Sequence, residues 1–364
     1  MDPLHNSEED FHLLSELVMN SSESGVSLAH ILPATGNLNR EGFDALAALA
    51  KKNHVILRAF ARLAELLKSD ASTGVAEWVS LTTARECSRI QNALGFLARI
   101  CATLEQNGCP VTVIKSLDHW PDLGSDLDLY TDSDPSHLVS CMRTEFDAKV
   151  DDRSWGDRLA NKWNFVVPGL PELVEVHIGR LGQTGEQTAL TKSLFQRTRI
   201  LNIGQYAFRV LAPEDRIIIS TLQRMYRHFY IRLCDIIDNA SLLESSCLDF
   251  TRLHSLGCSA GIWEGIATYL TIISGYVGEF RGNGISLPSL VTGSARFGVK
   301  QVYYRRDFLR VPILPHSLNL YAAELRKLVV RGELRNSLRL SLLPGLATAA
   351  ALELKLTGSD KGIW

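Results

Sequence analysis

The sequence predicts an α+β fold in which a small mixed β-sheet lies between helical regions. Apolar residues recur at helical spacing through residues 41–69 and 82–107, and Gly108 follows the second pattern as a typical helix C-cap. Helical spacing returns after Pro213, a residue that suits the first turn of a helix. Between these regions lie three short segments that indicate strands, by alternation of apolar and polar residues or by β-branched residues: Val111–Ser116, Asp126–Leu129 and Leu173–Ile178. Helices therefore precede and follow one block of strands.

The order of these elements divides the chain into four regions. We expect them to be a helical N-terminal region, a mixed core, a helical domain and a basic C-terminal region, over 1–108, 109–210, 211–290 and 291–364. Within the core, Pro168 and Gly169 predict the turn between two antiparallel strands. A chain of 364 residues is long enough for two or three compact lobes around more than one core.

The composition is that of an ordinary soluble globular protein, with 46% hydrophobic and 21% charged residues. A net charge of −2 provides no overall basic field that would attract nucleic acid. The absence of a C-x-x-C pair predicts reduced thiols and argues against a zinc site or a disulfide framework. The seven cysteines are Cys87, Cys101, Cys109, Cys141, Cys234, Cys247 and Cys258.

Targeting signals are missing from the sequence. The acidic N-terminus over 1–23 lacks the basic segment and the apolar core of a signal peptide. No apolar run reaches the roughly 18–20 residues that a transmembrane helix needs. We therefore expect a cytoplasmic protein without a transmembrane segment, and no oligomeric state follows from the sequence.

The sharpest motif is a pair of aspartates one residue apart on a predicted strand. Because side chains alternate across a strand, Asp126 and Asp128 point to one side while Leu127 and Leu129 point into the core. Two half-buried carboxylates held together repel each other and call for a cation, usually a divalent metal. The alternative is a polar turn whose aspartates are solvated, and the triplet alone leaves both interpretations open.

A later strand carries a second acidic motif. Glu175 and His177 share one face of the segment Leu173–Ile178, whose other face is apolar. Such a glutamate is most often the solvent face of an edge strand. After a same-face aspartate pair, however, it could complete a metal site with three carboxylates. Upstream, the first predicted strand ends in Lys115 and Ser116, ten residues before Asp126.

In this order the motifs resemble the nucleotidyltransferase superfamily of the polymerase-β type, and more narrowly the bacterial family of uncharacterised nucleotidyltransferases. The resemblance covers residues 85–255, and its specific motifs lie within 111–178. In that family the first strand typically ends in Leu-Lys-Gly, whereas Ser116 replaces the glycine here. The short connection with Pro121 predicts that the helix usual at this point is brief or missing. The matching segments are Ile114-Lys115-Ser116, Asp126-Leu127-Asp128-Leu129 and Val174-Glu175-Val176-His177.

The resemblance implies a metal site and its chemistry. Asp126, Asp128 and Glu175 would hold two Mg²⁺ ions, with Mn²⁺ as a possible substitute. One ion would activate the attacking hydroxyl and the other would stabilise the leaving pyrophosphate, and Glu175 could accept the hydroxyl proton.

The resemblance also implies contacts to the nucleotide. Lys115, Ser116 and Ser125 would contact phosphates of the donor, and His177 would contact substrate or support the metal ligands. For Lys115, a strand-end lysine that reaches solvent is an equally open interpretation.

Three basic residues after Pro213 are further candidates for the nucleotide site. Arg227, His228 and Arg232 lie in the region where the resembled family has helices behind its metal site. They could line the triphosphate or the acceptor pocket. The plainer alternative is a solvated helix face on which Arg232 pairs with Asp235.

The implied reaction moves a nucleoside monophosphate from an NTP donor, with ATP as the expected nucleotide, to an unidentified acceptor and releases pyrophosphate. The acceptor could be a small molecule, a protein side chain or an RNA end. One alternative is a nucleotide-binding or regulatory module of the same fold without turnover. Three carboxylates that repel one another argue against a role in binding alone.

A second alternative is binding of an anionic polymer by the basic C-terminal region. Between Arg296 and Arg339 ten Lys or Arg residues stand against three acids, with aromatic residues interleaved. This excess could instead offset the acidic N-terminus. The charges over 324–335 are also typical of one exposed, solvated helix. The string Gly257–Gly261 resembles a nucleophile elbow but joins helical segments, so it is set aside.

Overall fold

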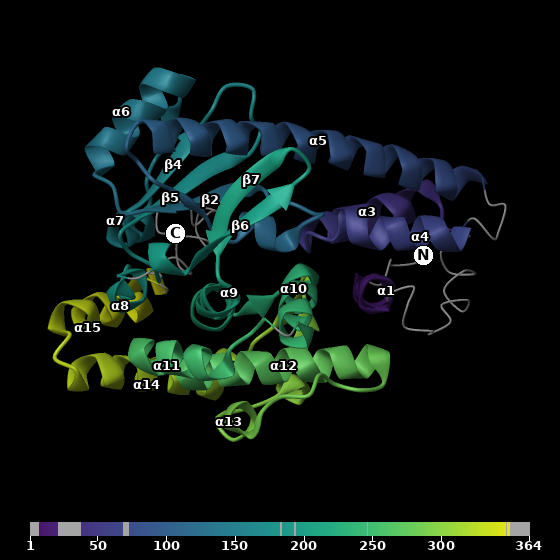
Figure 1. The fold of residues 1–364 in the computed structure, drawn as a ribbon. Helices are drawn as coiled ribbons and strands as arrows, with labels where there is room; N and C mark the ends of the chain where they lie inside the picture. The colour runs from purple at the N-terminus through teal and green to yellow at the C-terminus, as the bar shows by residue number, and fades with distance from the viewer. Residues whose placement is uncertain are drawn as a thin grey trace.

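The computed structural model describes residues 7–20, 38–67, 73–182, 184–192, 194–245, 247–346 and 348–349, and it confirms the α+β class (Figure 1). The α-helices are α1 (Ser7–Met19), α3 (Arg40–Lys52), α4 (Ile56–Leu67), α5 (Thr73–Gln106), α6 (Pro135–Phe146), α7 (Trp155–Ala160), α8 (Thr188–Thr191), α9 (Pro213–Thr221), α10 (Leu233–Glu244), α11 (Phe250–Ala260), α12 (Trp263–Arg281), α13 (Ser289–Thr292), α14 (Leu318–Val330) and α15 (Leu334–Ser341). The strands are β1 (Thr112–Val113), β2 (Asp126–Thr131), β3 (Lys149–Val150), β4 (Lys162–Val166), β5 (Leu173–Ile178), β6 (Thr198–Ile203), β7 (Tyr206–Leu211), β8 (Tyr230–Ile231), β9 (Tyr303–Arg305) and β10 (Phe308–Arg310). Short 3-10 helices are η3 (Ser116–His119), η4 (Phe195–Arg197) and η6 (Val299–Gln301), and π-helical turns are η5 (Leu222–His228) and η7 (Ile313–Ser317).

The predicted mixed sheet has seven strands in the order β3-β4-β5-β2-β1-β7-β6. Strand β2 pairs in parallel with β5 and antiparallel with β1, and β1 pairs in parallel with β7. The turn predicted at Pro168 and Gly169 does join two antiparallel strands, β4 and β5. The parallel pairing of β2 and β5 matters most for function, because it sets Asp128 directly opposite Glu175.

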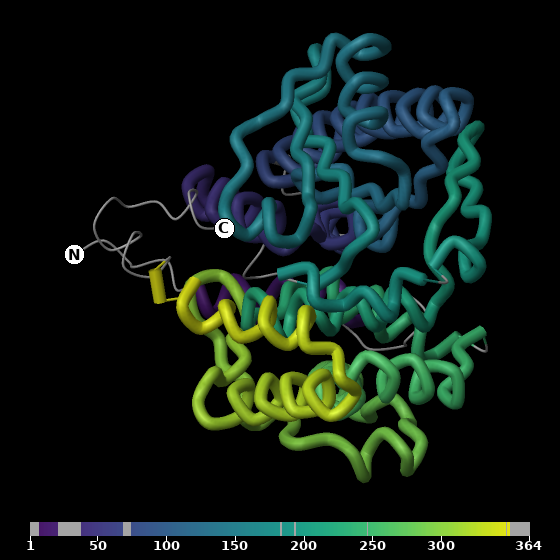
Figure 2. Tube along the Cα trace, turned by 90° about the vertical axis from the view of Figure 1, so that its left-hand side faces the viewer, coloured from purple at the N-terminus to yellow at the C-terminus, as the bar shows by residue number. Residues whose placement is uncertain are grey.

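The sheet is covered on both faces. One core cluster joins it to α5 and α6, and Figure 1 shows α5 running along that face. On the other face a small apolar cluster joins the sheet to α9, and it includes Ile114, Tyr130 and Ile219. The helices of the C-terminal third lie beyond α9, and Figure 2 shows them below the part of the molecule that carries the strands.

The N-terminal helices share a core with the later helices. A single cluster contains residues of α1, α3 and α4 together with residues of α10 and α12, and α1 contacts both α10 and α12. The four regions expected from the sequence stay a prediction.

Two predicted elements are shorter than expected. The segment 41–69 forms two helices, because the chain turns at Asn53 and His54, where His54 has φ of 53°. Asn53 docks this turn onto the start of α10, since its Oδ1 accepts the N–H of Leu233 at 3.2 Å and its backbone O accepts the N–H of Cys234 at 3.3 Å. The predicted strand 111–116 keeps only β1, and the brief connection expected after it is η3.

Two other predictions are corrected at the ends of elements. Helix α5 begins at Thr73 rather than at residue 82. The single exposed helix expected over 324–335 is wrong, because Gly332, with φ of 73°, separates α14 from α15. Glu324 is not solvated either: it is buried and accepts a hydrogen bond from the amide of Gln187. Within the described parts of the chain, none of the helices has the length and apolar character needed to cross a membrane.

Candidate metal and nucleotide site

An open cleft of about 710 Å³, solvent at its mouth included, collects nine of the ten residues predicted for the site. The tenth, His177, lies behind Glu175 and bonds to it. The cleft lies between the central strands β2 and β5 and the segment from η5 to the start of α10. The nine residues are Lys115, Ser116, Ser125, Asp126, Asp128, Glu175, Arg227, His228 and Arg232.

The three carboxylates owe their positions to the strand pairing. Asp126 and Asp128 lie two residues apart on β2, and Glu175 lies opposite Asp128 on β5. Ser116 fixes this end of β2, because its buried Oγ accepts the N–H of Asp128 at 2.7 Å. The same hydroxyl lies 3.2 Å from the backbone O of Asp126. In this structure Ser116 therefore holds the strand that carries the aspartates.

A lysine points into this group of acids. Lys115 has φ of 64° and ψ of −56°, and the N–H of Ser116 bonds to the O of Ile114 at 2.7 Å. This is a γ-turn with positive φ, a strained conformation that is rare outside functional sites. The turn aims Nζ of Lys115 at Asp128 Oδ1 (2.5 Å) and Glu175 Oε1 (3.6 Å). The interpretation of Lys115 as a lysine that reaches solvent is wrong, since 14% of its side chain is exposed.

A second lysine, which the sequence analysis did not identify, adds positive charge to the cluster. Lys162 on β4 places Nζ 2.9 Å from Glu175 Oε2 and 2.7 Å from Asp157 Oδ1. The turn predicted at 168–169 implies a strand that pairs with the one carrying Glu175. A partner for Glu175 could therefore have been sought on the same face of that strand, which is β4. Glu175 thus lies between two ammonium groups.

His177 is the third partner of Glu175. Its Nε2 lies 2.9 Å from Glu175 Oε1 and 4.0 Å from Asp128 Oδ1. Burial lowers the pKa of His177 to about 4, so the ring is neutral at physiological pH. One ligand atom from each of Asp128, Glu175 and His177 lies within 4.8 Å of the others, a spacing that could hold a metal ion. Asp126 is not part of this group of three.

The pKa values of the acids show that the cluster lacks positive charge. Burial, with the charge of Glu175, raises the pKa of Asp128 to about 7 although Lys115 opposes the shift. Burial and Glu175 also raise the pKa of Asp126. Burial would raise the pKa of Glu175 as well, but Lys115, His177 and Lys162 hold it well below its usual value. A further cation at this place would relieve the two aspartates.

The facing wall of the cleft is cationic. Arg227 and His228 come from the end of η5, and Arg232 precedes α10. Among the described residues, Arg227 and Arg232 form no ion pair with an acid. Burial and neighbouring arginines, Arg227 foremost, lower the pKa of His228 well below its usual value. Two guanidinium groups are therefore available to an anion in the cleft.

Arg224 is a wall residue that the sequence analysis did not select. Its Nε lies 2.7 Å from Asp235 Oδ2, and the backbone N–H of Arg232 donates to the same oxygen at 2.8 Å. The predicted side-chain pair between Arg232 and Asp235 is therefore wrong. The solvated helix face is not observed either, because Arg227, His228 and Arg232 are half-buried and line the cleft. The position of Arg224, three residues before Arg227, is the sequence signal that could have identified it as a wall residue. His54 and His119 also line the cleft, and no pattern in the sequence connects them to it.

Comparison with known proteins adds one distant likeness. No protein-family model matches the chain, and no curated protein matches it. Among solved structures, an antigenic nucleotidyltransferase-like protein from Paracoccidioides brasiliensis is similar at 15% sequence identity. The match covers 56% of this chain and 97% of that chain, with a TM-score of 0.36. A likeness at this level decides neither family nor activity, so the family resemblance stays a prediction.

Replacing Lys115 with Met tests whether its ammonium takes the place of a metal ion. The variant should melt at a lower temperature without metal, because unpaired buried charges cost about 3–5 kcal/mol. Mg²⁺ or Mn²⁺ should raise its melting temperature more than that of the wild type, since the ion no longer competes with the lysine. The matched control is Lys149→Met, which removes an exposed strand lysine. An equal or smaller metal effect in Lys115→Met would contradict this interpretation.

The buried His177 predicts a loss of stability in acid. Its pKa is about 4 in the folded chain against 6.5 for an ordinary histidine, so the unfolded chain takes up the proton first as pH falls. Its contribution to stability is therefore complete above about pH 6.5 and is lost towards pH 4. Between pH 7 and pH 4 the wild type should lose on the order of 3 kcal/mol more unfolding free energy than His177→Gln. Parallel stability curves of the two proteins over this range, measured by urea unfolding, would show that His177 does not carry this dependence.

Proposed function

We propose that this chain is a divalent-metal-dependent nucleotidyltransferase, which moves a nucleoside monophosphate from an NTP to an acceptor hydroxyl or phosphate and releases pyrophosphate. The observation that carries the proposal is the pairing of Asp128 with Glu175 beside Asp126, in a cleft whose other wall holds arginines without acidic partners. An acidic side suits metal ions and a cationic side suits phosphates, and a nucleotide bound with its metal presents both.

The residues present fit magnesium or manganese. Carboxylate oxygens of Asp126, Asp128 and Glu175 are the hard ligands that these ions prefer. The ammonium of Lys115, 2.5 Å from Asp128, already supplies a cation at this place. Bound ions would lower the pKa of the attacking hydroxyl and stabilise the charge on the leaving pyrophosphate. A nitrogen ligand suits these ions less well than oxygen, so His177 is not assigned as a metal ligand. It orients Glu175 through its hydrogen bond.

The chain's own side chains bind and orient the donor. Arg227 and Arg232 bind phosphate oxygens through their guanidinium groups. When the carboxylates gain another cation, the ammonium of Lys115 leaves Asp128 and pairs with a phosphate instead. Glu175, whose pKa is held well below its usual value, stays ionised at neutral pH. The ionised state supports a role of Glu175 as a metal ligand. It does not support the role of proton acceptor that the resemblance implies.

Binding of an anionic polymer is a second candidate, and one contact favours it. Arg310 on β10, in the basic C-terminal region, lies 5.2 Å from the ring of Tyr230 in the cleft wall. The basic region therefore adjoins the cationic wall, and a polymer with an anionic backbone could extend from the cleft along it.

The test is metal- and nucleotide-dependent turnover by the full chain. Each of the four NTPs is incubated with Mg²⁺ or Mn²⁺ and with a panel of acceptors that offer a hydroxyl or phosphate (small molecules, protein and RNA), and pyrophosphate release is measured together with the melting temperature. Asp128→Asn and Glu175→Gln should lose on the order of 10²–10⁴-fold of the rate, since catalysis rests on positioning and charge. The control Asp151→Asn removes an exposed carboxylate of the same region and should leave the rate unchanged.

The other outcomes separate the alternatives. Stabilisation by NTP and metal, without pyrophosphate release in the presence of any acceptor of the panel, would favour a non-catalytic nucleotide-binding module. No stabilisation by any NTP, together with salt-sensitive polymer binding that survives Asp128→Asn, would favour the polymer-binding candidate.

A further inference from the structure

A second cluster of metal-ligating side chains lies beside the carboxylates. Ligand atoms of His54, His119 and Cys234 all lie within 4.8 Å of one another. The three residues come from distant parts of the chain: the turn between α3 and α4, the end of η3 and the first turn of α10. The cysteine pattern argued against a zinc site, but a search for neighbouring cysteines in the sequence could not detect this grouping.

The distances suit a tetrahedral ion. Nε2 of His119 lies 3.9 Å from Sγ of Cys234, and the rings of His54 and His119 meet edge to face with centroids 5.4 Å apart. With zinc–nitrogen bonds near 2.0–2.1 Å and zinc–sulfur bonds near 2.3 Å, tetrahedral ligand atoms stand roughly 3.3–3.6 Å apart. Side-chain shifts of a few tenths of an ångström would bring His119 and Cys234 to that spacing.

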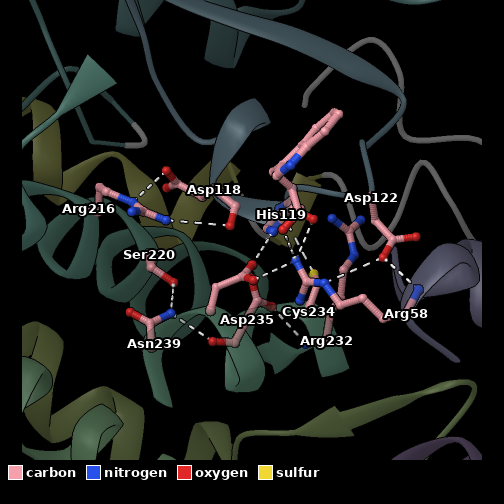
Figure 3. A network of polar contacts seen from close by, with 12 residues as sticks. Arg58, Asp118, His119, Asp122, Arg216, Ser220, Arg232, Cys234, Asp235 and Asn239 are labelled. Carbon is pink, nitrogen blue, oxygen red and sulfur yellow. Dashed lines mark hydrogen bonds and ion pairs between the residues drawn. The ribbon is translucent and has the colours of Figure 1, made fainter. Parts of the chain in front are cut away.

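A carboxylate behind His119 sets its orientation. Nδ1 of His119 lies 2.5 Å from Oδ2 of Asp238, and the other oxygen of Asp238 pairs with Nη2 of Arg58 at 2.7 Å. Nε2 of His119 is thereby directed at Cys234. Figure 3 shows His119 close to Cys234 and Arg58. A histidine whose second nitrogen is held by a carboxylate is the usual arrangement around zinc in proteins.

His54 offers a nitrogen without a partner. Its Nδ1 is buried and makes no hydrogen bond within the described residues. Gly124 makes room for the ring, since a Cβ there would lie 3.0 Å from Cε1 of His54.

We propose that His54, His119 and Cys234 bind one zinc ion, whose fourth position faces the cleft that holds the carboxylates. Two nitrogens and one thiolate select zinc over magnesium. Three protein ligands with one open position are typical of zinc sites that contact a substrate, and here the open position suits an anionic oxygen such as that of a phosphate. Binding replaces the thiol proton of Cys234, which is released to solvent with any proton on His119, and no electron is transferred.

Most of the neighbouring guanidinium groups are compensated. Arg58 pairs with Asp122 and Asp238, and Arg224 pairs with Asp235, whereas Arg232 has no acidic partner among the described residues. The thiolate of Cys234 supplies one further negative charge. The zinc site does not depend on the proposed nucleotidyl transfer.

Cobalt titration of the full, reduced, metal-free chain tests the proposal. We expect a thiolate-to-cobalt charge-transfer band that saturates at one thiolate-bound Co²⁺ per chain, separately from any Co²⁺ on the carboxylates, and displacement of this cobalt by Zn²⁺. Cys234→Ser should lose the band. The matched control is Cys258→Ser, because Sγ of Cys258 also lies near a histidine, 3.3 Å from Nε2 of His254, but belongs to no group of three among the described residues.

A second variant keeps the test decisive if Cys234→Ser does not fold. His54→Asn should fold, since asparagine tolerates the positive φ of this position. It should weaken cobalt binding more than the roughly 10–100-fold typical of losing an outer partner. No charge-transfer band in the wild type, a band that survives Cys234→Ser, or unchanged affinity in His54→Asn would overturn the proposal. Asp126→Asn should keep the band, so the zinc site and the proposed transferase can fail separately.

Discussion

The parallel pairing of β2 with β5 places Asp128 opposite Glu175, with Asp126 two residues away on the same strand, and much of the site follows from this juxtaposition. Half-buried carboxylates this close cannot all stay ionised without positive charge nearby. In the structure Lys115 and Lys162 supply it, and the pKa of Asp128 still rises to about 7. The cluster therefore favours a further cation. A strained turn at Lys115 holds the lysine ammonium in place, and a metal ion would displace that ammonium.

The helical parts of the chain form the cleft wall that faces the acids, and their contacts position it. Helix α9 packs on the sheet, and η5 continues from it to present Arg224 and Arg227. The salt bridge between Arg224 and Asp235 ties that wall to α10, and Asn53 ties α10 to the N-terminal helices. The contact of Asn53 with the start of α10 also brings the neighbouring His54 close to Cys234, although the two residues lie far apart in the sequence.

The strands and the acidic residues could be predicted because their signals are local. The two-residue period of a strand puts Asp126 and Asp128 on one face, and a buried apolar face opposite Glu175 and His177 defines the second strand. Lys162 and Arg224 depend on strand pairing and on a buried salt bridge, which a single sequence does not show. The break at His54 was missed because it depends on contacts of Asn53 with residues 180 positions away. Glu324 was misjudged because a charged residue was expected in solvent, whereas Gln187 satisfies it in the interior.

We propose that Lys115 occupies the place of a metal ion until a nucleotide arrives with its metal. The most direct measurement is a crystal structure with Mn²⁺ and a non-hydrolysable NTP analogue, in which anomalous scattering locates the manganese. We predict manganese among Asp126, Asp128 and Glu175, with Nζ of Lys115 moved from Asp128 to a phosphate. Lys115 still bound to Asp128, with nucleotide and manganese seated away from the three carboxylates, would contradict the account.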